Sequence, residues 1–92
     1  MIKVNEYFDG KIRSLGFERH GTPYTTGVIL PGDYSIDTEK EEHITVTVGE
    51  FEIRPTDSDW KTAQLGDTIV IPANATFDIK VSEPVSYICM YR

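Results

Sequence analysis

Short runs of alternating apolar and polar residues, rich in β-branched side chains, constrain this sequence more than any other feature. In the clearest run, residues 43–48, Ile44, Val46 and Val48 fall on one face and two threonines on the other. The chain holds ten Ile, seven Val and ten Thr, but only three Ala and three Leu. Because Ala and Leu favour helices whereas β-branched residues favour strands, the sequence predicts an all-β protein.

Gly and Pro residues separate these runs at intervals typical of turns. A chain of 92 residues forms one domain, so we expect a single domain over residues 1–92. With no helix to cover a sheet, the strands must form a closed barrel or a sandwich of two sheets. We predict strands at residues 11–17, 27–30, 33–37, 43–48, 50–54, 60–64, 68–71, 77–81 and 85–91.

The charge balance limits the partners of the protein. Nine Lys and Arg against 15 Asp and Glu give a net charge of −6, which repels nucleic-acid polymers and anionic membranes. The longest wholly apolar stretch, residues 69–73, is far too short to span a membrane. The single cysteine, Cys89, cannot form an intrachain disulfide, and no export signal opens the chain. We therefore expect a cytoplasmic protein in which Cys89 is a small buried hydrophobic residue.

Two spacings resemble the signatures of the cupin barrels. Glu42 and Gly49 fit the end of the first signature, and Phe77 stands where the second has a metal-binding His. No His-x-His precedes Glu42, so only one of the usual four metal ligands is present. The resemblance implies a single-domain cupin (RmlC-like) β-barrel or jelly roll without a metal or other cofactor. The second signature is Gly66-x5-Pro72-x-Asn74-x2-Phe77.

A second resemblance covers nearly the whole chain. It rests on a series of short segments, which are Asn5-Glu6-Tyr7-Phe8, Ser14-Leu15-Gly16-Phe17, Gly27-Val28, Gly32-Asp33-Tyr34, Glu41-Glu42, Asp59-Trp60 and Ser86-Tyr87. In order and spacing, these segments are similar to the pyrimidine/purine nucleoside phosphorylases, a family of small cupins. The resemblance implies phosphorolysis of purine and pyrimidine nucleosides to the free base and (deoxy)ribose 1-phosphate, with inorganic phosphate as co-substrate.

The chain departs from the family at one position that matters for phosphate. Family members carry Gly-Arg shortly before the segment aligned with residues 26–28, where this chain reads Thr22-Pro23-Tyr24-Thr25. The phosphate ligand is therefore open among the remaining cations. Arg54 and Lys80 alternate outward with acidic residues, as expected of a solvated face, whereas Lys40 lies in a loop that can fold over the mouth of a barrel.

Glu42 is the first catalytic candidate. It has the same parity as Ile44 and Val46, so it points into the barrel if they do. An inward carboxylate is costly unless it is bonded or functional, and the alternative is a solvated residue at the rim. A carboxylate facing the ribose would stabilise the cation that forms as the base leaves. His43 is the second catalytic candidate, although its opposite parity directs it away from the interior.

Aromatic and cationic side chains are the candidates for substrate binding. Aromatic rings stack on any base, which suits a site that accepts purines and pyrimidines, but they also serve in the core or in a dimer interface. The substrate-binding candidates are Tyr24, Lys40, Arg54, Trp60, Phe77, Tyr87 and Tyr91.

Two other functions stay open on the sequence. A non-catalytic cupin that binds a sugar or another small molecule fits the same fold, and fold alone does not distinguish it from an enzyme. A metal-dependent oxygenase or isomerase needs imidazoles that the chain lacks. Whichever function holds, we expect a homodimer that forms through sheet edges and aromatic faces, with residues 4–8 as an exchanged or docked edge strand.

Overall fold

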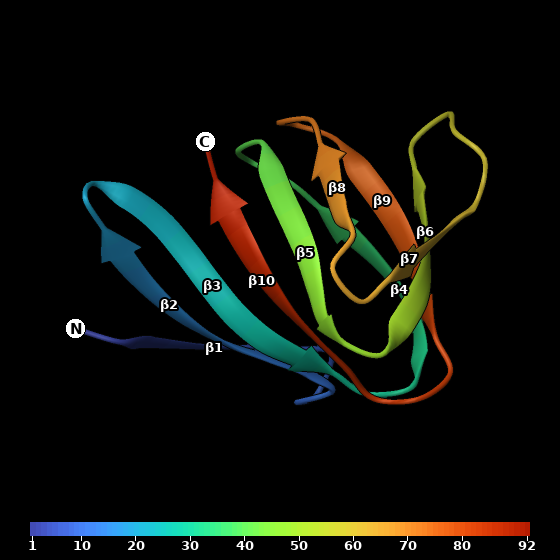
Figure 1. Ribbon diagram of the computed structural model, residues 1–92, viewed down its shortest axis with the longest axis horizontal. Coiled ribbons are helices and arrows are strands. Elements are labelled where there is room, and N and C mark those ends of the chain that lie inside the picture. The colour runs from blue at the N-terminus through green and yellow to red at the C-terminus, as the bar shows by residue number, and fades with distance from the viewer.

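The computed structural model describes residues 1–92 and consists of β-strands joined by turns, with no helix (Figure 1). The prediction of an all-β protein is therefore confirmed. The ten strands are β1 (Lys3–Tyr7), β2 (Ile12–Arg19), β3 (Thr22–Ile29), β4 (Gly32–Asp37), β5 (Glu42–Val48), β6 (Glu50–Pro55), β7 (Lys61–Gln64), β8 (Thr68–Ile71), β9 (Thr76–Val81) and β10 (Val85–Tyr91).

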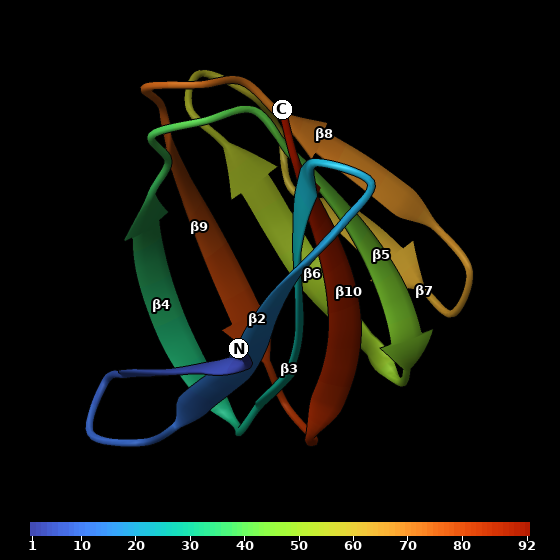
Figure 2. The same cartoon turned by 90° about the vertical axis from the view of Figure 1, so that its left-hand side faces the viewer.

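The strands form two antiparallel sheets that face each other (Figures 1 and 2). Sheet A has six strands in the order β1-β2-β3-β10-β5-β8, and sheet B has four in the order β4-β9-β6-β7. Of the two predicted arrangements, a closed barrel and a sandwich of two sheets, the structure has the sandwich, because no strand of one sheet pairs with a strand of the other. From β3 onward most connections cross from one sheet to the other, so the chain alternates between two layers and leaves each sheet with free edges.

Two strand boundaries differ from the prediction. β1 was not among the predicted strands, although residues 4–8 were expected to form a docked or exchanged edge strand; β1 pairs antiparallel with β2 of its own sheet. β3 begins at Thr22, well before the predicted residue 27, in spite of Pro23. Both segments are polar and carry little apolar alternation, so their strand conformation depends on pairing with neighbours that the sequence does not reveal.

The core lies between the sheets and follows the predicted alternation. Ile44 and Val46 point inward from sheet A, and Ile53 and Ile79 point inward from sheet B. Val48 was expected beside Ile44 and Val46 but is 61% exposed. The β5–β10 register shifts between Ser86 and Tyr87, which skips one residue of β5 and turns its last residue outward.

The β1–β2 turn closes one side of the space between the sheets. Figure 2 shows this hairpin reaching toward β4 at the edge of sheet B. The contact is aromatic, because the ring centroids of Phe8 and Tyr34 lie 5.0 Å apart at an interplanar angle of 57°. The Tyr34 hydroxyl in turn donates to the Leu30 carbonyl oxygen at 2.6 Å. The molecule has no helix of the length and apolar character needed to cross a membrane.

Candidate active site

The inner faces of the two sheets enclose a cavity of about 630 Å³. Sheet B contributes mainly apolar side chains to it, Ile36, Phe51, Phe77 and Ile79 among them. Sheet A contributes most of the polar side chains, from several of its strands, and Ser35 and Asp37 of β4 are the polar side chains that sheet B adds. The polar side chains from sheet A are Lys3, Tyr7, Ser14, Glu42, Tyr87 and Tyr91.

Glu42 begins β5 and faces the cavity on the same side of the strand as Ile44. The Cys89 thiol lies 3.6 Å from Glu42 Oε1 and donates to it. Burial raises the pKa of the Glu42 carboxyl above its ordinary value of 4.5, and the bond from Cys89 opposes that shift. Burial and the neighbouring carboxylate raise the pKa of Cys89 to about 12, so the thiol keeps its proton and acts as a donor.

Two tyrosines of β10 lie on the same inner face as Glu42, with Tyr91 opposite Glu42 and Tyr87 opposite Val46. The Tyr91 hydroxyl lies 2.9 Å from Thr25 Oγ1 of β3, and burial raises the pKa of Tyr91. Burial also raises the pKa of Tyr87 to about 12, while a hydrogen bond from Ser14 partly offsets that rise. Both phenols stay protonated at neutral pH and offer hydrogen-bond donors to the cavity.

Gly27 leaves the space that the Tyr87 phenol occupies above β3. A Cβ at position 27 would meet the Tyr87 hydroxyl at 2.7 Å and its ring carbon Cζ at 2.8 Å, so no other residue fits. Gly27 pairs with Tyr87 on one side and with Ser14 on the other. The phenol therefore crosses β3 over a bare backbone and brings its hydroxyl to Ser14 on β2.

The β4–β5 loop forms one edge of the cavity and is held at both ends. At one end, Thr38 Oγ1 donates to the Pro72 carbonyl oxygen at 2.7 Å and accepts from the Ala75 amide at 3.0 Å. At the other end, Glu41 and Arg92 exchange backbone hydrogen bonds of 2.9 and 3.2 Å. Lys40 of this loop lines the cavity, and so does Lys3 of β1; no other cation does.

The structure brings part of the predicted site together. Glu42, Lys40, Phe77, Tyr87 and Tyr91 all line the cavity, although they come from four different parts of the chain. Phe77 is 3% exposed and belongs to the apolar wall of sheet B.

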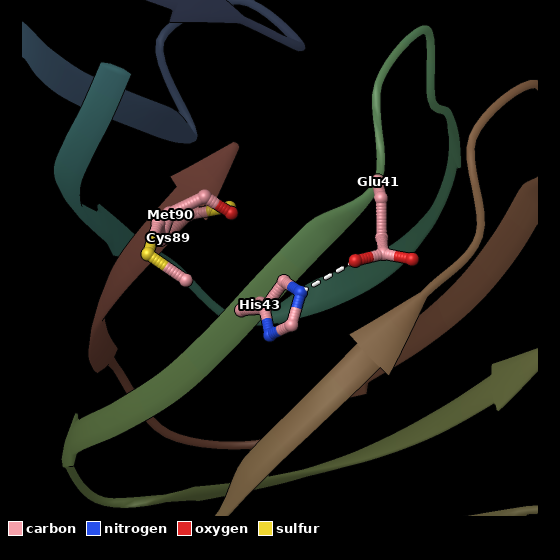
Figure 3. A network of polar contacts seen from close by, with 4 residues as sticks. All are labelled: Glu41, His43, Cys89 and Met90. Carbon is pink, nitrogen blue, oxygen red and sulfur yellow. Dashed lines mark hydrogen bonds and ion pairs between the residues drawn. The ribbon is translucent and has the colours of Figure 1, made fainter. Parts of the chain in front are cut away.

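Two of the candidates, His43 and Tyr24, lie on the outer face of sheet A and do not line the cavity, as the parity of His43 predicts. Figure 3 shows His43 turned toward Glu41, with 2.7 Å between His43 Nε2 and Glu41 Oε2. Tyr24 stacks on Phe17 with ring centroids 5.6 Å apart. Their strand neighbours Glu42 and Thr25 face inward, and alternation sends the next residue to the other side.

Arg54 and Trp60 are also outside the cavity, on the far face of sheet B. The Arg54 guanidinium lies 4.7 Å from the Trp60 ring centroid, and the Lys80 ammonium lies 4.4 Å from it. Arg54 also donates to Asp78 at 2.8 Å. The three side chains form a cation–π cluster with an exposed ion pair, and they do not line the cavity.

Several polar residues of the cavity wall are not among the candidates from the sequence. They are Lys3, Tyr7, Ser14, Ser35, Asp37 and Glu39, and Thr25, which does not line the cavity itself, bonds the lining residue Tyr91. The signal that could have found Lys3 and Tyr7 is alternation, since Lys3, Asn5 and Tyr7 share one parity in β1. That signal has meaning only once β1 is recognised as a strand paired with β2.

The residues present do not fit a metal ion. No three His, Cys, Asp or Glu side chains come together as ligands. The neighbour of Glu42 is Cys89, whose thiol keeps its proton and is therefore a poor metal ligand.

Comparison of the sequence with known protein families shows the family to which the chain belongs. The family model for pyrimidine/purine nucleoside phosphorylase matches residues 2–91. The chain belongs to this family. A pyrimidine/purine nucleoside phosphorylase from Hahella chejuensis is 42% identical over 92 residues, covering 99% of each chain. The protein of that name from Alcanivorax borkumensis is also 42% identical over 92 residues.

Solved structures agree with the fold. A protein of unknown function from Vibrio parahaemolyticus superposes with a TM-score of 0.95 at 35% identity, covering 100% of this chain and 99% of its own. A DMSP lyase structure superposes with a TM-score of 0.80 at 21% identity, covering 97% of this chain and 51% of its own. The second likeness concerns the fold alone, and it supports the arrangement of the strands in two facing sheets.

Proposed function

We propose that this protein catalyses the phosphorolysis of purine and pyrimidine nucleosides inside the cavity between the sheets. A phosphate oxygen attacks C1′ of the sugar, the C1′–N bond breaks, and its electron pair leaves with the base, which takes up a proton. The products are the free base and ribose 1-phosphate. The reaction moves a pentosyl group from a base to phosphate, which makes the protein a pentosyltransferase of the glycosyltransferase class.

The family match over almost the whole chain is the observation that carries this proposal. The cavity supports it independently, because the reaction needs a carboxylate near a sugar and neutral donors around it. Glu42 is that carboxylate. When ionised, it accepts hydrogen bonds from the ribose hydroxyls and stabilises the positive charge that develops at C1′.

The aromatic side chains around Glu42 support a site with broad tolerance of bases. Tyr87, Tyr91 and Phe77 line the same cavity and offer ring faces on which any base can stack. The raised pKa values of Tyr87 and Tyr91 keep their hydroxyls neutral, so they donate to a substrate oxygen without adding negative charge. We assign the ring faces of these aromatic residues to positioning of the nucleoside.

We propose inorganic phosphate as the co-substrate and no metal or organic cofactor. The absence of a ligand cluster around Glu42 supports this assignment. A chelator should therefore leave the activity unchanged. Activity that disappears with chelator and returns with one equivalent of a divalent metal would contradict it.

The direct test is incubation of the purified protein with uridine or adenosine, with and without millimolar phosphate. Free base and ribose 1-phosphate should form in equal amounts, and only when phosphate is present. Base release without phosphate would indicate a hydrolase instead. If no base is released but nucleosides bind saturably, the non-catalytic binding cupin becomes the better account.

We also propose that the protein works in the cytoplasm as a homodimer, formed through the outer face of sheet A. That face is apolar and exposed, and it has few charged groups. Two copies of a chain with net charge −6 repel each other least where they meet through such a face. Light scattering should give the mass of a dimer, and Ile88→Glu should give a monomer. A monomer mass for the wild type at micromolar concentration would contradict the proposal. The exposed apolar residues of the face are Val4, Leu15, Phe17, Val28, Val70 and Ile88.

A further inference from the structure

We infer that Lys3, together with the hydroxyls of Tyr7, Ser14 and Tyr87, forms the subsite that binds inorganic phosphate. This inference rests on the proposed function, and it assigns to a named set of residues a role that the sequence leaves open. The subsite lies on the β1–β2–β3–β10 part of sheet A, away from Glu42 at the start of β5.

The distribution of charge within the cavity is the first argument. Lys3 and Lys40 are its only cations, and Asp37, Glu39 and Glu42 are its carboxylates. All three carboxylates come from β4, β5 or the loop between them, and none comes from β1, β2 or β3. A dianion is therefore favoured at the β1 side, where the single positive charge is not offset by a carboxylate in the lining.

The hydrogen-bond donors are the second argument. Tyr87 reaches across Gly27 to Ser14, and Tyr7 is near enough to influence the pKa of Tyr87. Ser14 Oγ accepts from Asn5 Nδ2 at 3.3 Å, which orients this pair between β1 and β2. Three hydroxyls from three strands thus gather on the wall that carries Lys3, and neutral donors of this kind match the acceptor oxygens of phosphate.

The backbone around Lys3 explains how its side chain reaches the cavity. Lys3 pairs with Gly16 of β2, and a Cβ at position 16 would lie 3.7 Å from Lys3 Cβ. No side chain at position 16 competes with the lysine stem on the inner face. Lys40 is the weaker candidate for phosphate, because three glutamates lie within two residues of it in the chain and reduce its net attraction for a dianion. These are Glu39, Glu41 and Glu42.

The test compares Lys3→Met with Lys11→Met, which removes the same charge from the turn between β1 and β2, outside the cavity lining. In steady-state assays with uridine, Lys3→Met should raise the KM for phosphate at least about tenfold, because a charge-assisted hydrogen bond to phosphate is lost. The KM for uridine should stay within about twofold of wild type, and Lys3→Arg should recover most of the phosphate affinity.

Calorimetric titration with inorganic phosphate gives a readout that needs no turnover. Wild type and Lys11→Met should bind phosphate equally, and Lys3→Met should bind it at least about tenfold more weakly. If phosphate binding depends on Lys3 but the protein shows no phosphorolysis, the proposed function is contradicted and the phosphate subsite is still supported. Equal phosphate affinity in Lys3→Met and Lys11→Met, or a larger loss in Lys40→Met than in Lys3→Met, would overturn the subsite.

Discussion

The two walls of the cavity are built from different chemistry. On sheet B the inward residues, such as Ile53, Phe77 and Ile79, are apolar and almost fully buried. On sheet A the inward positions of β2, β3, β5 and β10 include Ser14, Thr25, Glu42 and Tyr91 among the apolar residues. Both sheets therefore contribute buried apolar residues to the core, and sheet A also holds most of the polar groups that can act on a substrate.

The difference shows how a small protein keeps a polar cavity. No buried side-chain nitrogen or oxygen lacks a hydrogen-bond partner, so the polar groups of sheet A satisfy one another between strands. Thr25 bonds Tyr91, Asn5 bonds Ser14, and Cys89 bonds Glu42. The same bonds that reduce the cost of burial also fix the groups in place before a substrate binds.

The largest effect on stability should come from the wall of sheet B. Ile53 is 0% exposed and does not line the cavity, so Ile53→Ala should lower the free energy of unfolding by about 2–5 kcal/mol through lost burial and a new void. The activity per folded molecule should not change. Urea denaturation measures the stability, and if this variant does not fold, Ile53→Val should show a smaller loss of about 0.5–1.5 kcal/mol. A denaturation midpoint equal to that of the wild type in both variants would contradict the claim that buried apolar residues of sheet B stabilise the fold.

A smaller effect on stability should follow from the polar wall. The Thr25–Tyr91 hydrogen bond is neutral, so a double-mutant cycle with Thr25→Val and Tyr91→Phe should give a coupling energy of about 1 kcal/mol. Denaturation of the wild type, the two single variants and the double variant measures it. A coupling energy of zero would mean that the two hydroxyls do not depend on each other.

The pH dependence should report the burial of Glu42. Because burial raises the pKa of Glu42, the native state binds more protons than the unfolded state between pH 4.5 and the raised pKa. The Glu42 contribution to stability is therefore lost as the pH rises through that window, and Glu42→Gln should gain stability relative to wild type over the same range. Catalysis needs the carboxylate, so the acid limb of kcat/KM should lie above pH 4.5. An acid limb at or below this value would contradict the role of Glu42.

The smallest effect should come from the outer face of sheet B. Arg54→Gln removes an exposed ion pair with Asp78 and one contact of the Trp60 ring, and because solvent screens the pair the midpoint of denaturation should hardly change. The KM values for nucleoside and phosphate should stay at wild-type levels. A raised KM for phosphate would indicate that Arg54 binds phosphate, and it would contradict a phosphate site in the cavity between the sheets.

Much of the fold could be predicted because alternation and turn residues are local signals. Strands such as residues 43–48 and 77–81 were found, and the parity of Glu42 with Ile44 correctly placed its side chain inside. The same parity rule sends His43 outward, where it bonds Glu41. Strand parity alone is thus sufficient to separate the two neighbouring candidates.

The rest of the site depends on pairing between distant strands. Nothing local distinguishes Tyr24, on the outer face, from Tyr87, because both are tyrosines in alternating segments. Lys3 faces the cavity only because β1 pairs with β2 in one register, and a shift of one residue would turn it to the other face. The separation into two sheets likewise follows from strand order, which composition and periodicity do not determine.

Glu42 and His43 give the most direct test of the claim that the chemistry lies on the inner face of sheet A, since they are neighbours in sequence that point to opposite faces. Phosphate-dependent release of base from uridine should be measured for Glu42→Gln and His43→Gln in parallel, with circular dichroism to verify the fold. The account predicts that Glu42→Gln loses about a hundredfold or more in kcat/KM, which corresponds to about 3 kcal/mol of transition-state stabilisation, while His43→Gln stays close to wild type. Full activity in folded Glu42→Gln, or a comparable loss in His43→Gln, would contradict it.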